Sequence, residues 1–107
     1  MPVSEIDVDQ LQSLDPLSLQ LIDVREPDEF EDARVPGALL IPLVTVPGRL
    51  DDLDATKPLY IICASGGRSM SAAKYLSEQG HDAVNIAGGT KAWVASGKAF
   101  DTGVLNS

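Results

Sequence analysis

The chain has 107 residues, of which 44% are hydrophobic and 22% charged, the balance of a folded globular domain rather than a disordered chain. Its net charge of −8 at pH 7 argues against nucleic acid and anionic membranes as partners. A single cysteine and a single histidine exclude an internal disulfide and a Cys/His metal cluster.

The first half of the chain alternates short aliphatic segments with helix signals. Asp7 and Gln10 have the spacing of a capping box, which predicts a helix carrying Leu11 and Leu14. Pro27 suits the first turn of a second helix. The predicted order is a strand at 3–6, the capped helix, a turn at 15–16, a buried strand at 17–24, the helix from Pro27, a strand at 37–42, and a weaker helix from Thr45 to Leu53 with Pro47 in its first turn.

The second half continues the alternation. A fourth strand at 58–63 is the most apolar, and the helix after it places Met70, Ala73 and Leu76 on one face and ends at Gly80. A fifth strand at 82–86 and a short helix within 88–97 follow. Strands separated by helices at this spacing pair in parallel. We therefore predict an α/β fold of three layers, with a central, mostly parallel five-stranded sheet and helices on both faces.

The amino-terminal residues show no targeting signal, and the acidic stretches show no metal signal. The first nine residues, MPVSEIDVD, lack the basic and apolar regions of a signal peptide, and no apolar run approaches the roughly 20 residues that cross a bilayer. The stretches EPDEFED and DDLD are interpreted as solvated surface. We expect a cytoplasmic protein that folds as one domain over residues 1–107, with neither a metal nor a cofactor.

The only cysteine lies in the segment CASGGRS, residues 63–69, where the most apolar strand ends and a helix begins. In open parallel sheets this edge is where ligands bind. Glycines allow the amides of residues 65–68 to turn toward an anion, and the amino end of the helix together with Arg68 favours a thiolate. We expect the pKa of Cys63 to lie below the value of about 8.5 that a free thiol has.

Each feature of this loop also has a purely structural interpretation. A cysteine that closes a buried strand is commonly an inert packing residue, and glycine pairs are common in turns. The position of Cys63 at the ligand-binding edge, followed by two glycines and then Arg68, favours the functional interpretation.

Four segments, in this order, resemble the rhodanese-homology domains, which are single-domain sulfurtransferases. LIDVREPDEF and VPGALLIP are similar to the family's amino-terminal signature, CASGGRS is similar to its active loop, and NIAGGTKAW followed by Gly97 is similar to its carboxy-terminal signature. The resemblance covers nearly the whole chain and implies a rhodanese-like α/β domain.

The resemblance also implies a persulfide mechanism. Cys63 would take a sulfane sulfur from a donor, either thiosulfate or a persulfide, and pass it to cyanide, a thiol or a protein acceptor. With no second cysteine in the chain, that acceptor must be external. His81 is expected at the surface, away from the loop. The substrate-binding residues implied by the resemblance are Ala64, Ser65, Gly66, Gly67, Arg68 and Ser69.

The chain departs from the family pattern at three places. Ala64 stands where many thiosulfate-using members carry arginine, so one cation is missing from the loop. Ala33 and Arg34 replace the usual Gly-His, which is interpreted as a structural exchange, with Arg34 a candidate for restoring positive charge near the pocket. Ala99 replaces a usual proline.

Several other residues of the matching segments are expected to stabilise the fold or to shape the pocket. Because an unpaired charge is costly at the end of a buried strand, Asp23 is expected to pair with Arg25 or with neighbouring loops. Phe30 and Trp93 are expected in the core. Gly88 and Gly89 are expected to shape a wall of the pocket.

Two other classes of function remain open. Phosphatases and arsenate reductases of related fold also place a cysteine and an arginine around an oxyanion, but with five residues between them, whereas Cys63 and Arg68 have four residues between them. The second alternative is a protein-interaction module, either non-catalytic or acting as a sulfur relay. The presence of Cys63 argues against the non-catalytic form, while the acidic surface could serve a protein partner that supplies or takes sulfur.

Overall fold

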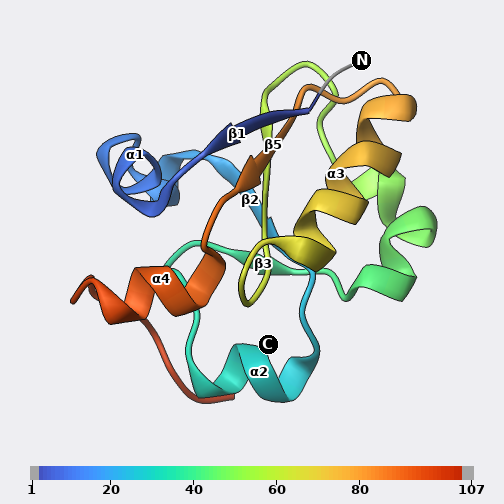
Figure 1. The fold of residues 1–107 in the computed structure, drawn as a ribbon. Helices are drawn as coiled ribbons and strands as arrows, with labels where there is room; N and C mark the ends of the chain where they lie inside the picture. Colours follow the sequence, from blue (N-terminus) through green and yellow to red (C-terminus); the bar gives the residue numbers. More distant parts are fainter. Residues whose placement is uncertain (1–2, 105–107) are drawn as a thin grey trace.

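In the computed structural model, which describes residues 3–104, the strands form one sheet with the order β1-β5-β4-β2-β3 (Figure 1). Every pair of neighbouring strands is parallel. The carboxyl ends of all five strands therefore meet at one edge of the sheet. The strands are β1 (Ser4–Ile6), β2 (Gln20–Asp23), β3 (Leu39–Leu40), β4 (Leu59–Ile62) and β5 (Ala83–Ile86).

Helices cover both faces of the sheet, as predicted. Figure 1 shows α3 (Gly67–Glu78) on one side and α1 (Val8–Ser13) and α4 (Gly89–Ala95) on the other. The 3-10 helix η2 (Leu43–Asp52) packs beside α3, while α2 (Pro27–Asp32) lies below α4 near the carboxyl edge of the sheet. A short 3-10 turn, η1 (Pro16–Ser18), precedes β2. No helix within residues 3–104 is both long and apolar enough to cross a membrane.

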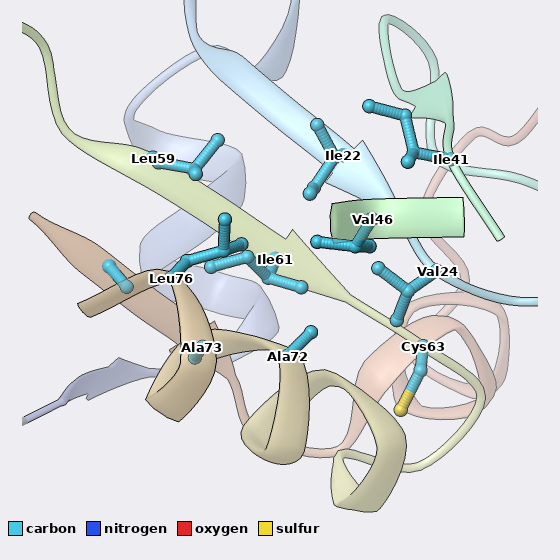
Figure 2. Packing of buried hydrophobic residues seen from close by; sticks show 11 residues of the cluster. Ile22, Val24, Ile41, Val46, Leu59, Ile61, Cys63, Ala72, Ala73 and Leu76 are labelled. Carbon is cyan, nitrogen blue, oxygen red and sulfur yellow. The ribbon is translucent and has the colours of Figure 1, made fainter. Parts of the chain in front are cut away.

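The central strands are buried on both faces, because successive side chains point to opposite sides of a strand. Ile22 and Ile61 pack toward α3 and η2 in the cluster of Figure 2, which ends at Cys63. Their neighbours Leu21 and Ile62 pack on the other face, against α1 and α4. The sulfur of Cys63 thus lies where the core meets the carboxyl edge of the sheet.

The predicted caps and anchors agree with the structure. The capping box of Asp7 and Gln10 is present, and Pro27 lies in the first turn of α2. Phe30 and Trp93 are both buried, the expected position for large aromatic anchors.

Several boundaries differ from the sequence-based expectation. Leu14 is not on the buried face of α1: it caps the helix and is 44% exposed, because the chain turns toward Asp15 there. The strand predicted at 37–42 pairs only at Leu39 and Leu40. The segment predicted as a helix from Thr45 is a 3-10 helix that begins at Leu43, so Pro47 lies inside it rather than in its first turn. Proline lacks the N–H that a regular α-helix would need at that position.

The expectation that His81 lies at the surface is wrong. It is buried rather than at the surface, with only 5% exposed. Gly80, at a φ of +96°, turns the chain back, and the His81 amide then donates to the carbonyl of Leu76. This turn brings the imidazole inside the helix–sheet layer.

Candidate active site

Cys63 follows directly on β4, and its side chain points into the turn that leads to α3 (Figure 2). Only 1% of the residue is exposed. Two donors contact the sulfur: the amide of Gly66 lies 3.1 Å from Sγ, and the hydroxyl of Ser69 lies 3.2 Å from it. Both are hydrogen-bond donors, so the surroundings of the sulfur suit a negative charge.

These contacts lower the pKa of Cys63. Burial raises the pKa of the thiol, but hydrogen bonds from the Ser69 hydroxyl and from the amides of Ser69, Gly66 and Ser65 outweigh it, and the net pKa lies below its usual value. A thiolate accepts these donors better than a thiol does. The expected lowering of the pKa is therefore present in this structure, without a histidine beside the sulfur.

The donors to the Cys63 sulfur come from the loop and from the start of α3. The amides that lower the pKa of Cys63 are those of Ser65, Gly66 and Ser69. The sequence did not predict that the hydroxyl of Ser69 contacts the Cys63 sulfur. Ser69 is fully buried near the start of α3, six residues after Cys63, and its contact with the sulfur depends on how the loop turns into the helix.

Glycine is required where the loop turns into the helix. Gly66 has a φ of +111°, a conformation that residues with a Cβ rarely adopt, and it forms the N-cap of α3. This conformation directs its amide toward the Cys63 sulfur. Its carbonyl accepts from the amide side chain of Asn85 on β5, at 3.4 Å, and the same side chain donates to Glu5 at 2.8 Å.

The backbone of α4 holds the other side of the loop. The amide of Thr90 donates to the carbonyl of Cys63 at 2.9 Å, and the amide of Lys91 donates to that of Ala64 at 3.0 Å. A Cβ at Gly89 would lie 2.4 Å from the Cys63 carbonyl oxygen, which no side chain tolerates. Gly89 thus allows the close approach of α4 to the loop. Neither Gly88 nor Gly89 lines the cavity, whose wall on this side is formed by the residues that follow them, so the expectation that the two glycines shape the pocket wall is wrong.

Arg68 has a partner that the sequence did not reveal. Its guanidinium forms a bidentate ion pair with Glu29 of α2, with Nη1–Oε1 at 2.7 Å and Nη2–Oε2 at 2.8 Å. Hydrogen bonding to Arg68 lowers the pKa of Glu29 to about 2, and the pair raises the pKa of Arg68 above its usual value. The two residues are 39 positions apart, so no local pattern pointed to the pair.

The other two arginines of this region are structural. Arg25 pairs with the buried carboxylate of Asp23 at 2.7 Å, as expected. The Arg34 guanidinium donates to the carbonyls of Phe30 and Gly103 and lies 4.9 Å from the centre of the Phe30 ring. It ties the carboxy-terminal segment to α2, so Arg34 is a structural exchange and does not restore positive charge at the loop.

A cavity of about 420 Å³ adjoins the loop between α2 and α4. Its wall includes Ala64, the residue that follows the cysteine, and Glu29, the partner of Arg68. A cavity of this size accommodates a small molecule. The remaining lining residues are Arg25, Asp32, Ala33, Thr90, Lys91, Val94 and Ala95.

The comparison with known proteins agrees with this geometry. Residues 7–96 match the family described as the Rhodanese-like domain. The chain belongs to this family. Its cysteine loop lies between the central parallel strand β4 and the helix α3 that follows it.

Relatives of the rhodanese-like chain include named sulfurtransferases. A protein of Allochromatium vinosum named "Sulfurtransferase" is 36% identical over 98 residues, which cover 89% of this chain and 92% of the relative. The Bacillus subtilis protein named "Putative sulfurtransferase YtwF" is 45% identical over 75 residues, covering 70% of this chain and 73% of the relative. The crystal structure of a rhodanese-like domain protein from Staphylococcus aureus superposes with a TM-score of 0.80 at 38% identity, covering 85% of this chain and 91% of that one.

Proposed function

We propose that this rhodanese-like chain is a sulfurtransferase that carries a sulfane sulfur on Cys63 as a persulfide. The observation that supports this most is the pair of donors at the buried sulfur, the Gly66 amide and the Ser69 hydroxyl, which favour the thiolate. The thiolate, not the thiol, is the nucleophile in sulfur chemistry.

The first step is the attack of the Cys63 thiolate on the outer sulfur of the donor. The new S–S bond forms as the bond between the outer sulfur and the rest of the donor breaks, and the leaving group departs with the electron pair of that broken bond. With thiosulfate as donor the leaving group is sulfite, and with a persulfide it is a thiolate. Residues 64–69 surround the position of the transferred sulfur, and the loop amides would stabilise its negative charge.

The second step regenerates the thiolate. An external nucleophile, such as cyanide, a small thiol or the thiol of a protein, attacks the terminal sulfur, and Cys63 is the leaving group. Cys63 is the only cysteine of the chain, so no internal thiol competes for the persulfide as a disulfide partner. The cavity beside Ala64 offers space for the body of a small donor or acceptor.

The experiment is intact-mass spectrometry after incubation with a sulfane-sulfur donor. The wild-type chain should gain the mass of one sulfur atom, and cyanide or a reducing thiol should remove it. Cys63→Ser should gain nothing and should lose sulfur transfer to cyanide by at least about 10³-fold, because the nucleophile is gone. Transfer by the serine variant at the wild-type rate would show that the sulfur is carried elsewhere.

A further inference from the structure

The arginine of the active loop is fully engaged by a carboxylate. Both terminal nitrogens of Arg68 donate to Glu29, one to each oxygen, in the planar geometry that guanidinium and carboxylate groups favour. The pair is only partly exposed, with 39% of the Arg68 side chain and 32% of the Glu29 side chain accessible. The positive charge of the Arg68 guanidinium is therefore compensated by the carboxylate of Glu29.

Among the described residues, the other charged side chains around the loop supply no net positive charge in its place. Arg25 is occupied by Asp23, and Ala64 supplies no charge. Lys91, which forms no ion pair within the part of the chain that the structure describes, lies on the wall of the cavity together with the carboxylate of Asp32. The charged side chains around the loop thus add up to no net positive charge.

Resting on the sulfurtransferase function proposed above, we propose that Glu29 sets the donor selectivity of Cys63. By compensating Arg68, it disfavours donors whose leaving group is a dianion, such as thiosulfate, and leaves persulfides as the preferred class.

The chemistry of the two donor classes differs at the leaving group. In the reaction with thiosulfate, the thiolate and the donor carry three negative charges together, and sulfite must leave as a dianion. In the reaction with a protonated persulfide, the thiolate gains the outer S–H sulfur and a single thiolate leaves. The first reaction is favoured by a net positive charge beside the loop, whereas the second is served by the amide and hydroxyl donors already at the sulfur.

The direct test alkylates Cys63 with two reagents that differ in charge, iodoacetate and iodoacetamide. Because the chain has one cysteine, each rate reports on this site alone. In Glu29→Gln, the ratio of the iodoacetate rate to the iodoacetamide rate should rise by roughly 3- to 10-fold, the effect of removing one charge a few ångströms beyond the guanidinium in a water-like medium. Glutamine keeps the side-chain oxygen that accepts from the Glu26 amide, so the cap of α2 is retained.

Glu31→Gln is the matched control. It removes the same charge from the same helix, at an exposed position whose side chain forms no hydrogen bond or ion pair with any residue from 3 to 104. Its ratio should remain at the wild-type value. An unchanged or lower ratio in Glu29→Gln, or an equal rise in both variants, would overturn the proposal, and neither result depends on the chain being a sulfurtransferase.

Steady-state kinetics then connect the charge to the donor. In Glu29→Gln, the KM for thiosulfate should fall by about 3- to 10-fold with a smaller change in kcat, while the KM for an organic persulfide stays within about twofold. An equal change for both donors would contradict the assignment of selectivity to Glu29. Thermal unfolding of both variants checks that they remain folded at the assay temperature.

Discussion

At the scale of single residues, the reactivity of Cys63 depends on donors rather than on a base. The one histidine of the chain is buried beyond the Gly80 turn, at the opposite end of α3 from Cys63. Burial alone raises the pKa of the thiol, and the hydrogen bonds from the Ser69 hydroxyl and the loop amides offset that effect. Among these donors, the hydroxyl is the one that a substitution can remove.

We therefore predict that Ser69→Ala raises the pKa of Cys63. In the wild type, the alkylation rate should reach half its maximum at a pH below that of a free thiol, because the thiolate is favoured. In Ser69→Ala, the midpoint should move to higher pH, since burial then meets fewer opposing hydrogen bonds. The measurement is the rate of iodoacetamide alkylation against pH.

Ser65→Ala is the control for this prediction. Ser65 contributes through its backbone amide, which alanine retains, and its side chain is exposed. Its midpoint should match that of the wild type. A midpoint that moves equally in both variants would show that the Ser69 hydroxyl is not the source of the effect.

The residues that could be predicted from the sequence share one property: their signals are local. Cys63 and its glycines lie in one short segment, and Asp23 and Arg25 are two positions apart. The pairing of Arg68 with Glu29 spans 39 positions, and that of Arg34 with Gly103 spans 69. Such long-range pairs depend on how α2 packs against the rest of the molecule. Patterns of residue spacing along the sequence cannot predict them.

At the scale of elements, the active loop is held between two helices, α3 after it and α4 beside it. The approach of α4 is close because Gly89 has no side chain there and adopts a φ of +59°. The amides of Thr90 and Lys91 can then reach the carbonyls of Cys63 and Ala64.

Gly89→Ala should accordingly destabilise the chain more than Gly97→Ala does. Both glycines have positive φ, so backbone strain should lower the free energy of unfolding of either variant by about 1–2 kcal/mol. A Cβ at Gly97 meets nothing within 4 Å, whereas one at Gly89 would collide with the backbone of Cys63 and Ala64. We expect Gly89→Ala to lower the free energy of unfolding by about 3 kcal/mol or more. Equal losses in urea denaturation would contradict the close packing of α4 on the loop.

Element types were easier to predict than element limits. The buried central strands β2, β4 and β5 have strong aliphatic patterns, and each was found within its predicted range. The edge strand β3 has only two paired residues, because pairing there depends on register with β2 rather than on its own composition. The limits of η2 also differ from the prediction, because Pro47 lies inside it, where a regular α-helix would need the N–H that proline lacks.

At the scale of the whole molecule, the dominant electrostatic feature is the net charge of −8 on a body of 33 × 29 × 24 Å. The Debye length is about 30 Å at 0.01 M salt and about 8 Å at 0.15 M. At low salt, an approaching anion therefore experiences the charge of the entire molecule, and at high salt only the charges near the loop. With Arg68 compensated by Glu29, the loop offers no strong attraction that salt could weaken.

The alkylation of Cys63 by iodoacetate should consequently become faster as salt increases. Between 0.01 M and 0.15 M sodium chloride we expect a rise of about two- to tenfold, because screening removes the long-range repulsion. The rate with uncharged iodoacetamide should change little, which separates charge from any effect of salt on the fold. In Glu29→Gln the rise should be smaller, since an uncompensated Arg68 would attract the reagent at low salt and lose that attraction to screening. A wild-type rate that falls with salt would mean that local attraction by Arg68 outweighs the repulsion of the whole molecule.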